Sequence, residues 1–379
     1  MHDPLARAGE SSLTRAREAP VRLRAVPAPT RGRPRSPRLG ADERRPPRVG
    51  PRARFALSVS LLGICALFGG CGAGAHGTST RARASTAAPR TARAPLRLSA
   101  VVAGHLPQAV SGEALIVRDG TVLVLGGLNR LDESTSSIVG YAPDSGRVRA
   151  AGALAQAKHD LAAASLQGRE LVLGGGSASE LDSVEELTGG LSGVRVGTLP
   201  SPRSDLSAAA TGGYVYVLGG FDGSAPLRQV LRTRDGRRFE VAGTLPVGVR
   251  YAALAAVGSM LYVFGGELAD GGDSRAIQAF DTATGHARLA GNLPEPVSHA
   301  AAVSLGGRIY ILGGRSGATA LRGIASYDPV SPRLRAAGEL PLAVSNAAAV
   351  SSGGVAYLVG GIGTGERTLD TVVAARPAR

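Results

Sequence analysis

Pairs of polar residues recur along the last three quarters of this 379-residue chain, and their types are those that bind ligands or do chemistry. Each pair lies at the fifth and sixth positions after a leucine that recurs at a nearly fixed interval. The pairs are Ser111/Gly112, His159/Asp160, Ser204/Asp205, Arg250/Tyr251, Ser298/His299 and Ser345/Asn346, and Lys158 and Arg203 directly precede two of them. A binding pocket needs convergent polar groups of this kind.

His159, Asp160, Asp205 and His299 are residue types that ligate metals, but their spacing argues against a metal site. No two of the histidines share a helical or hairpin spacing, and the ligands would come from separate units of the repeat. The chain also lacks a Gly-x-Ser-x-Gly elbow and a glycine loop of the phosphate-binding type. We therefore expect neither a metal nor any other cofactor.

A repeat of about 47 residues sets the register of these pairs. Glycine doublets begin at Gly126, Gly174, Gly219, Gly265, Gly313 and Gly360. The marker leucines are Leu106, Leu154, Leu199, Leu245, Leu293 and Leu340, each twenty residues before its doublet. Two markers that keep one register indicate a propeller or another array of equal units.

Each unit of the repeat fits four short β-strands. In the third unit we predict strands at 206–211, 214–218, 227–233 and 237–242, separated by turns that contain Gly or Asp. The first strand of most units is rich in alanine, which suits a strand that packs near an axis where several units converge. The last unit lacks a fourth strand, and residues 96–107 match one. We therefore predict that this N-terminal strand pairs with the last unit and closes a ring.

The repeat resembles the kelch family, in which such units form the blades of a β-propeller. The residues that carry the resemblance are the doublets, the strands before them such as "YVYVLGG" and "RIYILGG", and the third-strand sequences at 141–146 and 327–329. The resemblance covers residues 96–379 and implies an all-β, six-bladed propeller with four-stranded, kelch-like blades. One departure is that the chain has no Trp, which kelch blades usually carry in the fourth strand. Val148, Val194, Phe239, Ala287 and Leu334 occupy the equivalent positions.

The resemblance also implies where the polar pairs lie, because the loop that leads into the innermost strand lines one mouth of the central channel. We therefore predict a ligand-binding ring of Lys158, His159, Asp160, Arg203, Asp205, Arg250, Tyr251, His299 and Asn346. The alternative is a rim that is merely solvated. The polar loops after two doublets, 129–137 and 267–274, form a second candidate surface.

Kelch-like proteins include enzymes, so catalysis is the second hypothesis. The radical cofactor of galactose oxidase needs a Tyr–Cys crosslink, and no cysteine lies in residues 96–379. A sugar epimerase or mutarotase remains open, with Asp160, Asp205, Arg250 and His299 as its candidate groups. A purely structural role in the cell envelope is a third possibility.

The positive charge of the chain lies almost entirely before the propeller. The formal net charge is +14, but residues 1–95 hold 18 arginines against five acidic residues, whereas residues 96–379 are nearly neutral. The propeller has no basic stripe with interleaved aromatic residues, so we do not expect nucleic-acid binding.

Residues 49–70 resemble a bacterial lipoprotein signal peptide. Arg52 and Arg54 precede the apolar run 55–68, and small residues lead to Cys71, which would become the lipidated first residue. An ordinary secretory signal and an uncleaved anchor are the alternatives. Because residues 1–48 precede the signal, we expect translation to begin at Val49; if this Arg/Pro-rich segment is made, we expect it to be disordered. Residues 71–95 fit a flexible tether.

The sequence thus predicts an exported, lipid-anchored monomer on the outer face of the cell membrane, with secretion as the alternative. Its propeller is expected to bind a protein or a glycan at the cell envelope.

Overall fold

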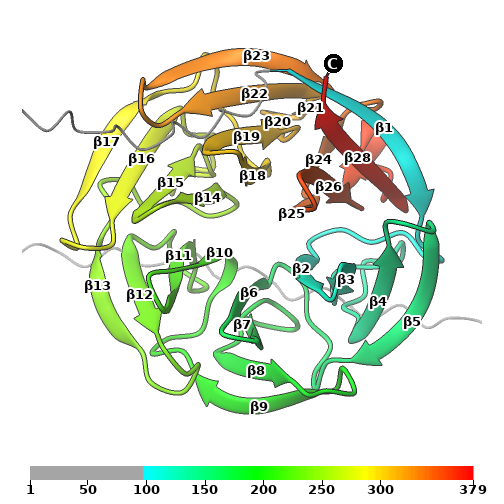
Figure 1. The fold of residues 1–379 in the computed structure, drawn as a ribbon. Helices are drawn as coiled ribbons and strands as arrows, with labels where there is room; N and C mark the ends of the chain where they lie inside the picture. The colour runs from blue at the N-terminus through cyan, green and yellow to red at the C-terminus, as the bar shows by residue number, and fades with distance from the viewer. Residues whose placement is uncertain (1–96, 379) are drawn as a thin grey trace, which may run out of the picture. The chain divides into compact units, whose positions relative to one another are not determined.

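Six four-stranded antiparallel sheets surround a central axis in the computed structural model, which describes residues 97–378 (Figure 1). The prediction of an all-β, six-bladed propeller is confirmed. The predicted signal peptide, the lipidation site Cys71, the tether and residues 1–48 lie outside the described residues. The 3₁₀ turn η1 (Thr364–Glu366) is the one helical segment within 97–378, so this part of the chain holds no helix that could cross a membrane.

The first three blades follow one another along the chain, and within each blade the strands run in chain order from the innermost to the outermost. Blade 1 consists of β2 (Ala114–Arg118), β3 (Thr121–Leu125), β4 (Ser137–Ala142) and β5 (Arg147–Ala153). Blade 2 consists of β6 (Ala162–Leu166), β7 (Arg169–Leu173), β8 (Ser183–Leu187) and β9 (Gly193–Thr198). Blade 3 consists of β10 (Ser204–Thr211), β11 (Tyr214–Phe221), β12 (Gln229–Thr233) and β13 (Glu240–Thr244).

The last three blades are again described from the innermost strand outwards. Blade 4 consists of β14 (Ala253–Val257), β15 (Met260–Phe264), β16 (Ala276–Asp281) and β17 (Ala287–Asn292). Blade 5 consists of β18 (Ala301–Leu305), β19 (Arg308–Leu312), β22 (Gly323–Asp328) and β23 (Arg333–Glu339). Blade 6 consists of β25 (Ala348–Ser352), β26 (Val355–Val359), β28 (Thr371–Pro377) and β1 (Leu98–His105). Two-residue ladders, β20 (Arg315–Ser316) with β21 (Thr319–Ala320) and β24 (Val344–Ser345) with β27 (Ile362–Gly363), extend two loops.

The ring closes as the sequence predicts, because β1 is the outermost strand of blade 6. It runs antiparallel to β28, with Leu98 opposite Pro377 and His105 opposite Thr371. The first and last strands of the described chain therefore hold each other in one sheet, and the propeller has no open gap between its ends.

Some strand limits differ from the predicted ones for a local reason. The fourth strand of blade 3 begins at Glu240 and not at Arg237. The Asp235 carboxylate accepts hydrogen bonds from the amides of Arg237 (2.8 Å) and Arg238 (2.9 Å), which lengthens the turn at the expense of the strand.

The glycine doublets lie where neighbouring blades meet. Gly219 has a φ of +62°. A Cβ atom at this position would come within 2.5 Å of the Val249 carbonyl oxygen in the loop that leads to blade 4. The amide of Gly220 donates to that same oxygen at 3.0 Å. The doublet therefore allows one blade to bond to the next at close range, and it carries no chemistry.

Candidate functional site

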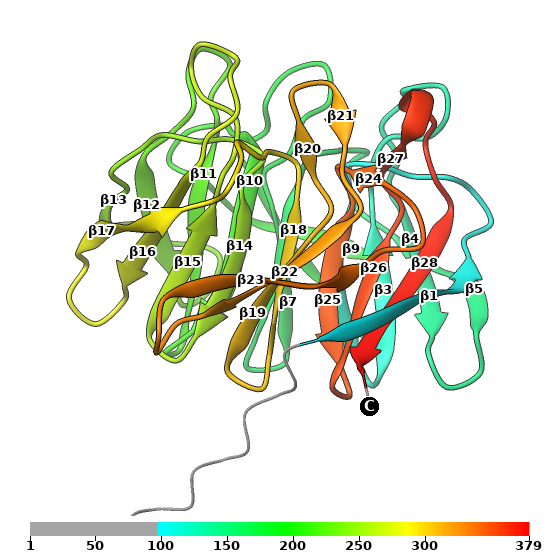
Figure 2. The same ribbon diagram turned by 90° about the horizontal axis from the view of Figure 1, so that it is seen from above.

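The fourth, fifth and sixth residues after each marker leucine lie in three different surroundings, and only the sixth faces the centre of the propeller. The fourth-position carbonyl accepts a hydrogen bond from the doublet of the preceding blade, as Lys158 does from Gly127 (2.9 Å). The fifth position pairs with the loop after the doublet of its own blade, as His159 does with Gly176. The sixth position lines the central pocket. The loops lie at one end of the propeller, at the top in Figure 2.

The sixth positions are joined by a closed ring of backbone hydrogen bonds, one from each blade to the next. The amides donate in the order Asp160 to Gly112 (2.6 Å), Asp205 to Asp160 (2.9 Å), Tyr251 to Asp205 (3.0 Å), His299 to Tyr251 (2.9 Å), Asn346 to His299 (2.9 Å) and Gly112 to Asn346 (3.1 Å). Each bond is close to a normal backbone hydrogen bond in length. The ring therefore fixes the positions of five side chains before any ligand arrives.

All six ring residues have a left-handed backbone, with φ between +47° for Asp160 and +62° for Gly112. This conformation is uncommon for residues other than glycine and costs about 1 kcal/mol or more each. Each of the six residues donates one backbone hydrogen bond in the ring and accepts another. These bonds, which form only in the assembled propeller, therefore hold the left-handed backbone conformation in place. Gly112 has a further steric reason, because a Cβ atom there would collide with the Asp160 carboxylate.

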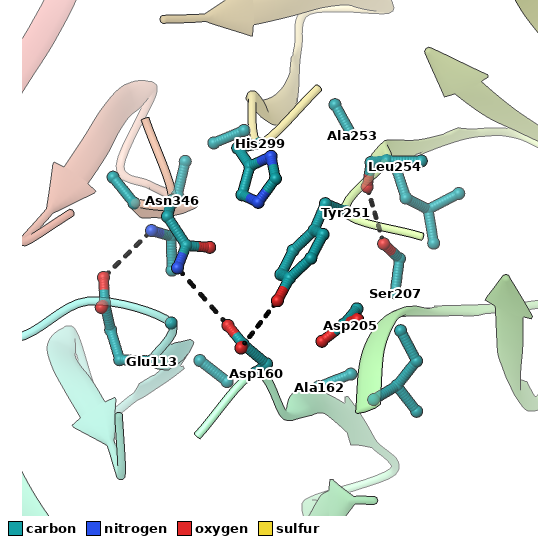
Figure 3. Close-up of a pocket in the computed structure, with 18 of the residues that line it drawn as sticks. Glu113, Asp160, Ala162, Asp205, Ser207, Tyr251, Ala253, Leu254, His299 and Asn346 are labelled. Carbon is teal, nitrogen blue, oxygen red and sulfur yellow. Dashed lines mark hydrogen bonds between the residues drawn. The ribbon is translucent and has the colours of Figure 1, made fainter. Parts of the chain in front are cut away.

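The ring surrounds the mouth of a pocket of about 180 Å³ (Figure 3). Asp160, Asp205, Tyr251, His299 and Asn346 are the polar side chains that the ring itself contributes to this pocket. Alanines of the innermost strands line the rest of its wall, including Ala162, Ala208, Ala253, Ala301 and Ala348. The alanine-rich strands therefore leave an open channel below a polar mouth.

The side chain of Tyr251 connects the two aspartates of the ring. Its hydroxyl donates to Asp160 Oδ2 at 3.1 Å, and it also bonds to the carboxylate of Asp205. Asn346 Nδ2 lies 3.5 Å from the other Asp160 oxygen. Residues from blades 2, 3, 4 and 6 thus meet over the channel, as Figure 3 shows.

Burial shifts the pKa of both aspartates towards neutrality. It raises the pKa of Asp160 to about 6, against the opposing hydrogen bonds from Tyr251 and Asn346. Burial and the charge of Asp160 raise the pKa of Asp205 to about 7. Burial and the two carboxylates also raise the pKa of Tyr251, so its hydroxyl keeps its proton. Near neutral pH the carboxyls of Asp160 and Asp205 can therefore gain or lose a proton, whereas the Tyr251 hydroxyl stays protonated and donates a hydrogen bond.

His299 is a neutral side chain held in place by packing. Its ring stacks on that of Tyr251, with centroids 3.8 Å apart and planes inclined by 21°. Its Nδ1 lies 2.8 Å from Ser298 Oγ. Burial, helped by the charges of Arg315 and Arg250, lowers its pKa to about 3. It is therefore a hydrogen-bonding group at the mouth and not a cation.

Arg250 and His159 lie beside the pocket and not in its lining. The Arg250 Nε donates to Glu267 Oε1 at 2.9 Å, and Nη1 lies 3.5 Å from Asp205 Oδ2. Arg315 reaches the other Glu267 oxygen at 2.8 Å. Glu267 belongs to the loop 267–274, which the sequence predicts to be a polar surface, but its side chain is buried between these two arginines.

The structure corrects the placement of Lys158 and Arg203, whose side chains are fully buried and do not line the mouth. They occupy the fourth position, where the other four blades have Val110, Val249, Val297 and Val344. Lys158 Nζ pairs with Glu185 Oε1 at 2.7 Å and donates to Ser183 Oγ at 2.8 Å. The Arg203 guanidinium contacts neutral oxygens of Gly219, Ser201 and Gln229 at 3.3 to 3.5 Å. Both cations therefore belong to the interior of the blades.

Glu113 also lines the pocket, although it is not among the residues predicted from the sequence. It is buried and accepts a hydrogen bond from the Ala348 amide at 3.0 Å. Burial raises its pKa to about 8. The signal was available in the repeat, because the seventh position is apolar in the other five units: Leu161, Leu206, Ala252, Ala300 and Ala347.

Within residues 97–378, no group of three or more His, Cys, Asp or Glu side chains is arranged to hold a metal ion. The site therefore offers hydrogen bonds, exchangeable protons and negative charge from its own side chains.

Comparisons with known proteins agree with the blade structure. The Kelch motif model matches residues 202–232 and 296–332, which cover the first three strands of blades 3 and 5. The chain is 27% identical over 169 residues to "Kelch repeat protein M-T8" of Myxoma virus (strain Lausanne), a match that covers 43% of this chain and 33% of the relative. The chain thus spans about a third of the length of this curated relative.

The fold is also similar to a solved structure. The chain described as "Structure of YjhT" superposes with a TM-score of 0.63 at 14% identity, over 71% of this chain and 95% of that one. At this identity the likeness shows a shared fold. Kelch motifs and a propeller fold together are typical of modules that bind proteins.

Proposed function

We propose that this chain is a binding module of the cell envelope, which holds a protein or a glycan partner by a polar group inserted at the channel mouth. The observation that carries the proposal is the ring of sixth positions, which presents Asp160, Asp205, Tyr251, His299 and Asn346 around one pocket. A rim that is only solvated needs no such convergence. A preorganised ring also avoids part of the ordering cost of binding.

The test is a thermal-shift screen of the purified chain against envelope sugars, sialic acid, amines and divalent cations. A compound at one hundred times its dissociation constant stabilises the folded protein by about 2.7 kcal/mol. We expect at least one compound to raise the Tm of the wild type, and the shift to be lost in Tyr251→Phe and His299→Asn. Asparagine tolerates the left-handed backbone at position 299.

The matched control is His286→Asn, which changes a histidine in the turn between β16 and β17, away from the pocket. It should keep the whole shift. A shift that survives in both mouth variants would move the site elsewhere on the propeller.

The anchoring of the module is a separate proposal that rests on the signal-like sequence before Cys71. Expressed from its own start in a bacterium, the chain should fractionate with membranes and carry a lipid on Cys71 by mass spectrometry. Cys71→Ser should release it. A wild-type chain found free in the external medium, without lipid, would favour the secretory alternative.

A second function, sugar epimerisation or mutarotation, is favoured by one observation. Two carboxyls with pKa values near 6 and 7 lie on either side of the Tyr251 hydroxyl, and acid–base catalysts work best near their own pKa. Nuclear magnetic resonance of anomer exchange would detect it. An enzyme would lose turnover in Asp205→Asn although the ligand still binds, whereas a binding module has no turnover to lose.

A further inference from the structure

The pocket at the channel mouth is lined by three carboxyl side chains and by no lysine or arginine of residues 97–378. The carboxyls are Glu113, Asp160 and Asp205, and each side chain is at most about one-tenth exposed. The lining imidazole, His299, is neutral because its pKa is lowered. Any charge that the side chains lining this pocket carry is therefore negative.

Most cations near the mouth are committed to other partners. Arg250 and Arg315 share the Glu267 carboxylate, and only Arg250 also reaches Asp205, at 3.5 Å. Lys158 is paired with Glu185 inside blade 2. Neither Glu113 nor Asp160 has an ion pair with a lysine or an arginine among the described residues.

Glu113 is the side chain that most needs a further partner. It is 5% exposed, and its Oε1 accepts from the Ala348 amide. Its Oε2 is buried and has no hydrogen-bond partner within residues 97–378. An unsatisfied buried carboxyl oxygen is costly, and a donor brought by a ligand would remove that cost.

We propose that the group bound at the channel mouth is a protonated primary amine. This inference rests on the proposed function, that the mouth holds a ligand. An ammonium group has three donors and no acceptor, which complements a pocket rich in carboxylate oxygens. A pocket of about 180 Å³ is close in size to a cavity of about 150 Å³ that holds a benzene ring, so it fits one sugar ring or the end of a lysine side chain.

The amine should bind in exchange for protons. The charged and titratable groups that face Asp160 are His159, Glu113, Tyr251 and Arg250, and those that face Asp205 are Asp160, Tyr251, Arg250 and His159. Burial raises the pKa of Glu113 to about 8, that of Asp205 to about 7 and that of Asp160 to about 6, so near neutrality Glu113 is mainly protonated and the two aspartates are partly protonated in the free protein. A bound ammonium favours their charged forms, so protons leave as the amine enters.

The experiment is isothermal titration calorimetry of the purified chain with D-glucosamine and with Nα-acetyl-lysine amide, which separate an amino sugar from a lysine side chain as the source. N-acetylglucosamine is the neutral analogue and glucuronate the anionic one. At pH 7, where both amines are mainly protonated, we expect at least one amine to bind tenfold or more tightly than both analogues. The affinity should fall at least tenfold at pH 5.5, and buffers of different ionisation enthalpy should reveal proton release.

Isosteric variants identify the groups. Asp160→Asn and Asp205→Asn keep a residue that tolerates the left-handed backbone, and Glu113→Gln keeps the acceptor for Ala348. Each should weaken amine binding tenfold or more, whereas Glu240→Gln, an exposed carboxylate of β13, should not change it.

The inference is overturned if the neutral or the anionic analogue binds as tightly as the amines. It is also overturned if the affinity for the amines is the same in the wild type and in all three variants. An analogue that binds at the mouth when neither amine does would overturn the inference and leave the proposed function standing. Failure of all four calorimetric probes and of every compound in the thermal-shift screen would overturn both.

Discussion

At the scale of single residues, the mouth depends on side chains that tolerate an unusual backbone. Five of the six ring positions are Gly, Asp, Asp, His and Asn, which are the types most often found with positive φ. Tyr251 is the exception, and its hydroxyl links the two aspartates. The residue types at these positions are thus one signal in the sequence for a left-handed backbone. The position within the repeat is a stronger signal, and it alone predicts that the five polar ring residues lie together.

The destinations of Lys158 and Arg203 could not be predicted in the same way. Both lie two residues before a ring position, and the chain turns between the fourth and the sixth positions, so the fourth side chain enters the blade and not the channel. A buried lysine also requires a buried partner. Nothing in the spacing of Lys158 and Glu185 along the chain indicates that these two residues pair. Only the folded blade brings the two together.

The raised pKa of Asp205 gives a prediction on stability. A carboxyl whose pKa rises on folding stabilises the protein below its unfolded pKa, and that stability is lost as pH rises through the folded pKa. Asp205 changes from 3.8 to about 7. Relative to wild type, Asp205→Asn should therefore gain about 3 kcal/mol of unfolding free energy between pH 4 and pH 8. Urea unfolding at several pH values measures this gain.

The control for this prediction has the opposite sign. Hydrogen bonds from Ser224, side chain and amide, and from the Ala225 amide lower the pKa of Asp222. Asp222→Asn should therefore be less stable than wild type at pH 8 and approach it as pH falls. Parallel stability curves for wild type and Asp205→Asn would contradict the account of the mouth as a set of buried, protonatable carboxyls.

At the scale of the elements, the repeat markers were informative because they are packing requirements. The doublets mark the register in the sequence, and the structure gives their role at the blade seam: each first glycine approaches a carbonyl oxygen of the next blade's loop. The repeat holds a third marker, a glycine two residues before each marker leucine. At Gly197 a Cβ atom would collide with the backbone of the next blade at Gly236, so sequence spacing alone could not give its reason.

Two glycines with nearly the same φ allow the cost of the backbone conformation to be measured apart from the cost of a steric contact. Gly219 (φ +62°) faces the Val249 carbonyl, whereas a Cβ atom at Gly212 (φ +58°) would meet nothing within 4 Å. Gly212→Ala should cost about 1 kcal/mol for its backbone. Gly219→Ala should cost about 2 kcal/mol more, because the seam must open. Urea unfolding compares them, and equal costs would mean that the seam is not close-packed.

At the scale of the whole molecule, closure of the ring makes the mouth possible. The circle closes where Gly112, which follows β1, donates to Asn346, which precedes blade 6, and the pairing of β1 with β28 joins the same two parts of the chain. Closure was predicted because the last unit lacked one strand and the N-terminal segment supplied it. The circle itself was not predicted, because backbone bonds between blades have no residue signature.

Removal of β1 tests the closure. A chain that starts at residue 106 leaves β28 as an unpaired edge, and exposed edges invite association. We expect its Tm to fall by about 5 °C or more, with oligomers in size-exclusion chromatography, whereas a chain that starts at residue 96 should keep its Tm and elute as a monomer. Identical melting and elution of the two chains would show that β1 does not close the ring.

The most direct test of the central claim is a crystal structure of the propeller soaked with the compound that gives the largest thermal shift. The account predicts ligand density inside the ring, within hydrogen-bonding distance of Asp160, Asp205 or Asn346. Density confined to the loops after the doublets, or to a seam between blades, with only solvent at the mouth, would contradict it.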